Sequence, residues 1–505
     1  MLELLAFAQL SSALLRLDCA ALQRIALPDA RITEAALVPE GVFEPPGRAS
    51  LTPSRARRME PLPEHCRVSI VLQPTDDSTI NVELWLPVED WNGKFLAVGN
   101  GGWAGSIQGY ADMQEALRRG YATAGTDTGH SAADGPAGQF ALGHPEKLVD
   151  FAYRAIHDMT VKSKRVIQAF YAPQLEYSYF KGCSTGGRQA VMSAQRYPGD
   201  FDGIIAGALA NRHIHMHAAG VHRSIALTRA PEYALTEDKA TLVNDAVMAQ
   251  CDALNEGFLN DPRQCAFNFR ALACTSADTA AGNLCLTRPE LETVLAYYDG
   301  TRYADGTLIF SGQALGNPIP ALQGSPDGPG SFAFDTIRIL GFQDPDYDWR
   351  AFDIERDLPV IDAAVGWVDA TDPDLRAFRA HGGKLLLYAG WRDTGITPEN
   401  TILYYESVRE ELGPQQSDWM RLFLAPGMGH CRGGPGINTF DTLSALEQWR
   451  EAGVAPDTLD GSNPQTGVTR PICPYPQAAR YSGFGTVGDA RNWSCADPED
   501  DLWSD

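Results

Sequence analysis

A five-residue turn constrains the fold more than any other feature of this sequence. Gly182-Cys-Ser-Thr-Gly186 matches the pattern G-x-S-x-G, in which a serine sits on a sharp turn between a strand and a helix. A strand-like run, 177–180, precedes the turn, and a helix-like run, 188–196, follows it. The start of a helix also favours negative charge that develops nearby. An ordinary glycine-rich turn can show the same letters, but this setting predicts that Ser184 is a nucleophile.

The chain around this turn alternates between strand-like and helical patterns. This alternation predicts an α/β fold with a mostly parallel sheet that is covered by helices on both faces. It is lost between 211 and 372, a segment with four cysteines and a loop rich in Gly and Pro. We therefore expect a core in two parts, 1–210 and 373–505, and an inserted lid domain at 211–372. The strand-like runs of the core lie at 67–72, 80–86, 94–98, 121–126, 177–180, 203–206, 384–388 and 420–425, and helical runs lie at 110–119 and 151–170.

An acid and a histidine follow the serine in the order that the α/β-hydrolase fold uses. Asp393 comes five residues after the strand-like run 384–388, and His430 follows the run 420–425. A serine nucleophile needs a histidine as its base and an acid that orients the histidine. His130 also follows a strand-like run but precedes Ser184, so we interpret it as structural or pocket-lining. His381 precedes a strand-like run rather than following one, so it lacks the position that the catalytic histidine needs.

Two cysteines lie beside the proposed serine and histidine. Cys183 precedes Ser184, and Cys431 follows His430. If the two side chains meet, their chain neighbours lie close enough for a disulfide, which needs Cα atoms about 4.4–6.8 Å apart. The alternatives are that Cys183 is a buried thiol or is itself the nucleophile.

Together these residues resemble the tannase and feruloyl esterase family, which includes mono(2-hydroxyethyl) terephthalate hydrolases. The resemblance implies an α/β-hydrolase fold with a large lid, and an esterase that cleaves esters of aromatic acids. We expect the lid to provide the substrate pocket. Other matching segments are 98–103, 120–130, 182–187, 201–204, 285–287, 342–345, 382–384 and 390–391. The disulfide pairs that the resemblance implies are Cys19–Cys66, Cys183–Cys431, Cys251–Cys265, Cys274–Cys285 and Cys473–Cys495.

Members of this family often carry a calcium-binding loop in the lid. Here the matching stretch, 251–265, resembles a shortened form that keeps Asp252, with Asn255 and Glu256 in place of other acids. Calcium is usually coordinated by six to eight oxygen ligands, several of them carboxylates. We therefore expect weak calcium binding or none, and the chemistry itself should require no cofactor.

Two further site predictions concern the oxyanion hole and the substrate. The rule for this fold assigns one oxyanion donor to Thr185, and we choose Gly102 over Gly101 for the other. Arg338 and Phe342 lie four residues apart, so on a helix they would share a face. Phe342 could stack on an aromatic ring, and Arg338 could pair with a terephthalate carboxylate; the alternative for Arg338 is an ordinary ion pair.

Two other classes of function are open at this point. A metal-dependent hydrolase could use His213, His215 and His217, with His222 nearby, although no Glu follows them in a zincin pattern. Ordinary polar residues of a lid helix are the simpler interpretation. A non-catalytic binding protein on the same scaffold is the second class, and the complete Ser, Asp and His set argues against it.

Charge and hydrophobicity limit the partners. The net charge is 41 − 64 = −23, which argues against a nucleic-acid binder. No run of 18 apolar residues occurs, so we expect no membrane span. The apolar run Leu4–Leu15 has no basic residue before it, so we predict a helix there rather than a secretory signal. The cysteines and the resemblance favour a secreted or periplasmic protein with a small aromatic ester as its partner.

Overall fold

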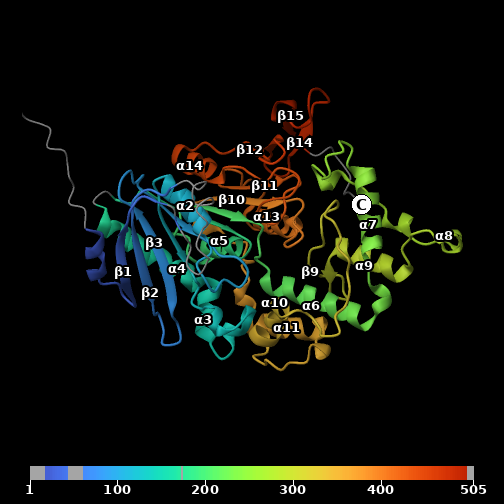
Figure 1. The fold of residues 1–505 in the computed structure, drawn as a ribbon, viewed down its shortest axis with the longest axis horizontal. Coiled ribbons are helices and arrows are strands. Elements are labelled where there is room, and N and C mark those ends of the chain that lie inside the picture. Colours follow the sequence, from blue (N-terminus) through green and yellow to red (C-terminus); the bar gives the residue numbers. More distant parts are fainter. Residues whose placement is uncertain (1–17, 42, 44–60, 172–173, 498–505) are drawn as a thin grey trace, which may run out of the picture.

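A mixed sheet of nine strands forms the centre of the molecule (Figure 1). The computed structural model describes residues 18–41, 43, 61–171 and 174–497, so the helix predicted at Leu4–Leu15 lies outside the described residues. The strand order is β1-β2-β3-β5-β4-β6-β7-β10-β11. The strands are β1 (Ala30–Val38), β2 (His65–Leu72), β3 (Ile80–Pro87), β4 (Lys94–Val98), β5 (Ala122–Thr126), β6 (Tyr177–Cys183), β7 (Gly203–Gly207), β10 (Lys384–Gly390) and β11 (Met420–Ala425).

The sheet has an antiparallel part and a parallel part. β1, β2, β3 and β5 pair antiparallel, whereas β5, β4, β6, β7, β10 and β11 pair parallel. The sequence patterns indicate the parallel part and the strands β2 and β3, but they miss β1. Only two of the nine residues of this edge strand are buried, so its sequence lacks the apolar alternation that marks a half-buried strand.

Helices cover both faces of the parallel part, as the alternation predicts. Successive side chains of a strand point to opposite faces, so Phe95 of β4 packs into one core cluster and Leu96 into the other. The cluster that contains Phe95 also takes side chains from α4 (Ala155–Phe170), α5 (Thr185–Arg196) and α13 (Pro398–Leu412). The cluster that contains Leu96 takes them from α2 (Tyr110–Arg118) and α14 (Thr442–Ala452).

The chain between β7 and β10 adds no strand to the large sheet, and all of residues 208–383 are described. Part of this insertion lies at the far end of the molecule from β1 (Figure 1). Two apolar clusters hold it: one is formed mainly by α7 and α9, and the other joins α6, α10 and α11 to core residues such as Trp103 and Phe151. Its elements are α6 (His213–Arg229), α7 (Glu237–Cys251), α8 (Ser276–Ala281), α9 (Arg288–Asp299), β8 (Thr301–Arg302), β9 (Leu308–Phe310), α10 (Ser331–Asp335), the π-helix Thr336–Gly341, α11 (Ile354–Val365) and α12 (Arg376–Ala380).

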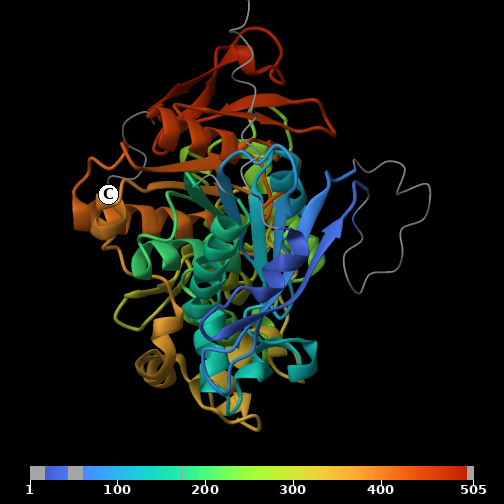
Figure 2. The same cartoon turned by 90° about the vertical axis from the view of Figure 1, so that its left-hand side faces the viewer.

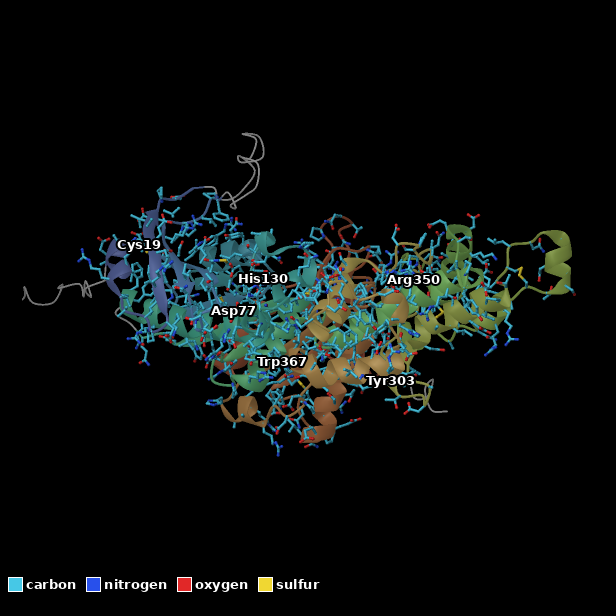
Figure 3. The ribbon with its side chains drawn as sticks, turned by 90° about the horizontal axis from the view of Figure 1, so that it is seen from below. Cys19, Asp77, His130, Tyr303, Arg350 and Trp367 are labelled. Atoms are coloured by element: carbon cyan, nitrogen blue, oxygen red, sulfur yellow. A yellow bond between two sulfur atoms is a disulfide. The ribbon has the colours of Figure 1, made fainter. Side chains whose placement is uncertain are left out.

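The C-terminal segment forms two small antiparallel hairpins beside the end of the sheet (Figure 2). These pair β12 (Leu459–Ser462) with β13 (Thr469–Ile472), and β14 (Ala478–Tyr481) with β15 (Trp493–Ala496). A view from below places Cys19 at the end with the first strands, His130 further in, and Arg350 of the insertion beyond it (Figure 3). The short helix α3 (Pro145–Val149) lies before α4 along the chain.

All ten cysteines form disulfides in the structure. The pairs are those that the family resemblance implies: Cys19–Cys66, Cys183–Cys431, Cys251–Cys265, Cys274–Cys285 and Cys473–Cys495. Five bridges in one chain are typical of proteins that fold outside the reducing cytosol.

Candidate active site

Ser184 occupies the tight turn between β6 and α5 that the sequence predicts. Its backbone has φ 66° and ψ −122°, a conformation that residues other than glycine rarely adopt and that costs on the order of 1–3 kcal/mol. The flanking glycines allow this turn: a Cβ on Gly182 would lie 2.4 Å from the carbonyl oxygen of Gly186, and one on Gly187 would lie 2.3 Å from that of Gly207. The small residues of the motif are therefore required by close backbone contacts.

Asp393 and His430 meet at the ends of neighbouring strands. Asp393 follows β10, His430 follows β11, and these two strands pair in parallel. The His430 ring nitrogen Nδ1 lies 2.8 Å from Asp393 Oδ2. The other carboxylate oxygen of Asp393 accepts hydrogen bonds from the N–H groups of Gly395 and Ile396, at 2.8 and 2.9 Å. Asp393 is completely buried, so these bonds fix it in one orientation toward the histidine.

The insertion also contributes to the position of Asp393. The side-chain amide of Asn317 donates a hydrogen bond to the Asp393 carbonyl oxygen at 2.8 Å, and Asn317 is itself fully buried. The loop that carries the acid is therefore held from the core and from the insertion.

Ser184 and His430 line one cavity of about 600 Å³. The disulfide Cys183–Cys431 joins their chain neighbours, with Cα atoms 5.9 Å apart. Ser184 is half-buried, and the His430 side chain is 38% exposed, so both can be reached by a substrate.

The backbone N–H groups of Gly102 and Thr185 fit an oxyanion hole better than that of Gly101. The Gly101 N–H is already used, because it donates to Gln108 Oε1 at 2.7 Å. Among the described residues, the N–H groups of Gly102 and Thr185 have no hydrogen-bond acceptor. The Thr185 hydroxyl donates to the Gly102 carbonyl oxygen at 2.6 Å, which joins the two segments next to Ser184.

Several buried groups that sequence reasoning missed hold the loop around Gly102. Gln189 of α5 accepts a hydrogen bond from the Asn100 N–H at 3.0 Å, and the Asn100 side chain donates to the Thr126 carbonyl oxygen at 2.7 Å. His130 Nε2 lies 2.7 Å from the Trp103 carbonyl oxygen, which agrees with the structural role expected for this histidine. Gln189 carries no sequence signal, because it looks like any polar residue of a helix.

The insertion meets this loop through Trp103. The indole N–H of Trp103 donates to the Phe332 carbonyl oxygen at 2.9 Å. The Phe332 ring, 55% exposed, would lie 3.6 Å from a Cβ on Gly102. However, the cavity that contains Ser184 is lined by core residues alone, at 99–102, 108–109, 111–112, 181–184, 388, 430–432, 438–440 and 442. The expectation that the lid provides this pocket is therefore wrong for the cavity as it stands.

The structure does not bring Arg338 and Phe342 to this cavity. Arg338 Nε donates to Asp335 Oδ1 at 2.8 Å, the ion pair that we gave as the alternative, and its side chain lines a different hollow near Phe140. Phe342 stacks on Tyr347, with ring centroids 4.6 Å apart. The helix ends at Gly341 and has a π-helical turn, so a four-residue spacing does not place the two side chains on one face toward Ser184.

The shortened loop at 251–265 does not fit a calcium site. The Asp252 carboxylate accepts hydrogen bonds from the N–H groups of Glu256 and Gly257, at 3.0 and 2.7 Å. The Glu256 carboxylate pairs with the fully buried guanidinium of Arg470 at 2.6 Å. Asn255 has φ 54° and serves the turn. An arginine from the C-terminal segment thus provides positive charge beside this loop.

Two of the histidines of α6, His213 and His217, face apolar surroundings rather than a cluster of metal ligands. The rings of His213 and His217 lie 4.3 Å apart and beside Trp103, and both residues are buried. Burial lowers the pKa of His217 to about 3 and that of His213 well below its usual value. His215 instead pairs with Asp362. Across residues 18–41, 43, 61–171 and 174–497, no three His, Cys, Asp or Glu side chains come together in a way that could hold a metal ion.

Comparison with known proteins identifies the class. The feruloyl esterase B structure from Aspergillus oryzae matches with a TM-score of 0.84 and 31% identity, over 95% of this chain and 99% of that one. The tannin acyl hydrolase of Aspergillus niger matches at 21% identity with a TM-score of 0.71, over 93% and 92% of the two chains, and shows the fold alone. The chain therefore has the α/β-hydrolase fold.

The sequence comparisons define the family. The family model described as tannase and feruloyl esterase matches residues 66–496. An uncharacterised esterase of Xanthomonas campestris pv. campestris is 36% identical, over 95% of this chain and 91% of the relative. A probable feruloyl esterase B-2 of Neosartorya fischeri is 33% identical, over 85% and 86% of the two chains. The chain belongs to the tannase and feruloyl esterase family and is a carboxylic ester hydrolase. Among the residues that the structure describes, no helix is long and apolar enough to span a membrane.

Proposed function

We propose that this protein hydrolyses esters of aromatic carboxylic acids, with Ser184 as nucleophile, His430 as general base and acid, and Asp393 as the group that orients His430. The observation that carries the proposal is the hydrogen bond between His430 and Asp393 at one wall of the cavity that Ser184 also lines. A serine, a histidine and a buried acid in this arrangement support acyl transfer.

The reaction proceeds in two steps through an acyl-enzyme. His430 takes the proton of the Ser184 hydroxyl as its oxygen attacks the ester carbonyl carbon, and the N–H groups of Gly102 and Thr185 stabilise the oxyanion. The intermediate collapses, the C–O bond to the alcohol breaks, and His430 gives the alcohol its proton. Water then attacks the acyl-enzyme by the same route and releases the acid. Asp393 keeps Nδ1 of His430 protonated, so that Nε2 can accept the proton.

The acid part of the substrate is aromatic in this proposal, of the feruloyl, galloyl or terephthaloyl type. Family membership and relatives named as feruloyl esterases support this class. Tyr388 and Phe440 also line the cavity, with ring centroids 5.5 Å apart, and they offer apolar surface to a ring. A narrower form of the proposal is hydrolysis of mono(2-hydroxyethyl) terephthalate. The five disulfides support secretion or a periplasmic location.

The first prediction tests the nucleophile. Ser184→Ala should abolish turnover of galloyl, feruloyl and terephthaloyl monoesters, with a loss in kcat of at least about 1000-fold. The circular dichroism spectrum and the melting temperature should stay close to those of the wild type, because the change removes one oxygen atom from a half-buried side chain.

Two additions to this assay separate the alternatives. A fluorophosphonate probe should label the wild type but not the variant, and a chelator should leave the wild-type rate unchanged. Retained hydrolysis in Ser184→Ala would rule out Ser184 as the nucleophile, whereas loss of activity with chelator would favour a metal-dependent reaction.

A further inference from the structure

One arginine in the candidate active-site cavity has no carboxylate partner among the described residues. Arg432 lines the cavity with Ser184 and His430 and is exposed. No described residue forms an ion pair or a side-chain hydrogen bond with its guanidinium group. In contrast, Arg338 pairs with Asp335 and Arg470 with Glu256.

The other charges of the cavity are compensated within the protein. Lys181 contacts Asp112 at 2.8 Å and Glu115 at 3.7 Å. Burial lowers the pKa of Lys181, but these two carboxylates raise it further than burial lowers it. Lys181 is therefore charged and already paired. The guanidinium of Arg432 is free to bind an anion that enters from solvent.

A tight turn puts Arg432 and the candidate catalytic histidine beside the same cavity. The Arg432 N–H donates to the His430 carbonyl oxygen at 2.8 Å, across Cys431, which has φ 62°. The bridge to Cys183 ties this turn to the residue before Ser184. The backbone of Arg432 is thus attached to the same disulfide-bridged turns as the serine and the histidine, which keeps its side chain beside the same cavity.

We propose that Arg432 binds a free carboxylate of the ester substrate, so that the enzyme prefers esters that carry a second, negatively charged carboxyl group. This inference rests on the proposed function, because it assigns a specificity role within the same site. Arginine is always charged and matches a carboxylate with two parallel hydrogen bonds. The rings of Tyr388 and Phe440 in the same cavity suit the aromatic part of such a substrate.

The carboxylate can belong to the acid part or to the alcohol part of the ester, and two substrate pairs distinguish these sources. For the acid part, methyl benzoate is compared with monomethyl terephthalate, which differs by a para carboxylate. For the alcohol part, a benzoate ester of a simple alcohol is compared with the benzoate ester of the corresponding hydroxy acid. For each pair, the preference is the ratio of kcat/KM for the charged ester to kcat/KM for the neutral ester.

Three variants are measured with these pairs. Arg432→Gln should lower the preference by about 10- to 100-fold for the pair whose carboxylate contacts the arginine, since hydrogen bonds to charged groups are strong. Arg432→Lys keeps the charge but not the two-pronged geometry, so it should restore part of the preference. Arg338→Gln is the matched control, because that arginine lies outside the cavity, and it should leave the preference unchanged.

The wild type provides a readout that needs no variant. Raising the salt concentration should raise KM for the charged ester more than for its neutral partner, because ions screen the attraction. The inference is overturned if the wild type shows no preference in either pair, or if Arg432→Gln changes the preference no more than Arg338→Gln does. Failure of the proposed function gives a different result, in which the wild type hydrolyses none of the four esters and takes up no fluorophosphonate.

Discussion

At the scale of single residues, Thr185 stands out because two of its groups serve the same candidate site. Its backbone N–H is one of the proposed oxyanion donors, and its hydroxyl donates to the Gly102 carbonyl oxygen at 2.6 Å. Thr185 is 2% exposed, so water cannot replace this hydroxyl if it is removed. The hydroxyl therefore positions the peptide segment that carries the other donor.

Thr185→Val tests this positioning role. The variant keeps the shape of the side chain but leaves the Gly102 carbonyl oxygen without its donor, a change worth roughly 1–3 kcal/mol. We expect kcat to fall about 10-fold or more, with little change in KM, because the oxyanion forms only in the transition state. Thr185→Ser keeps the hydroxyl and should retain most of the activity. Equal kcat values for the two variants would contradict the role of the hydroxyl.

The residues of the candidate site differ in how far the sequence could predict them. Ser184, Asp393 and His430 each follow a strand, and strand ends can be recognised from apolar runs. The sequence could not separate Arg338 from Arg432, because the difference lies in tertiary contacts. Asp335 forms an ion pair with Arg338, whereas no described carboxylate pairs with Arg432. Gln189 and Asn100 support the loop around Gly102 through a hydrogen bond between residues far apart in the sequence, so the sequence alone does not reveal their role.

At the scale of elements, α6 carries two neutral histidines into the apolar layer between the insertion and the core. His213 and His217 are both at most 4% exposed. Among the described residues, the ring of His217 has one hydrogen bond, between its Nδ1 and Thr336 Oγ1 at 2.6 Å. Burial lowers the pKa of His217 to about 3, whereas an unfolded chain takes up this proton near pH 6.5.

This difference predicts how stability depends on pH. Below pH 6.5 His217 binds a proton in the unfolded chain but stays neutral in the folded protein. The contribution of His217 to the free energy of unfolding therefore falls by about 1.4 kcal/mol per pH unit. The loss continues as the pH falls toward the folded pKa. In His217→Asn, which can still reach Thr336, this loss should be absent. Urea unfolding at pH 7, 6 and 5 should show the stability difference shifting in favour of the variant as the pH falls.

A matched control is available in the same chain. His381 is exposed at the end of α12, so His381→Asn should leave the pH dependence of wild-type stability unchanged. A stability difference between wild type and His217→Asn that stays constant from pH 7 to pH 5 would contradict the burial argument.

Strands can be predicted from the sequence where burial on both faces produces a run of apolar residues. β4 and β11 begin and end where the apolar runs of the sequence do, because both faces of these strands are buried. β1 is an exposed edge strand without such a run, and it depends on pairing with β2 along eight residue pairs. The turn at Thr336–Gly341 is π-helical, and nothing in its composition distinguishes it from an ordinary α-helical turn.

At the scale of the whole molecule, the proposed catalytic residues come from distant parts of the chain, and a disulfide joins two of these parts. Cys183–Cys431 spans 248 residues and encloses the complete insertion, whereas Cys473–Cys495 spans 22 residues of the C-terminal segment. Both bridges should stabilise the fold by restricting the unfolded chain, and the longer loop should gain more. Only the first bridge also fixes the spacing between the turn of Ser184 and the turn of His430.

Replacing each pair of cysteines by alanine separates stability from catalysis. In the chain-entropy account, losing Cys183–Cys431 should cost about 5 kcal/mol of unfolding free energy, and losing Cys473–Cys495 about 3 kcal/mol. Well below both melting temperatures, Cys183→Ala/Cys431→Ala should lose at least about 10-fold in kcat, because its serine and histidine are no longer tied at one distance. Cys473→Ala/Cys495→Ala should keep the wild-type kcat at that temperature. If both double variants keep it, the bridge beside the serine serves stability alone, and the backbone of the two turns is sufficient to align the site.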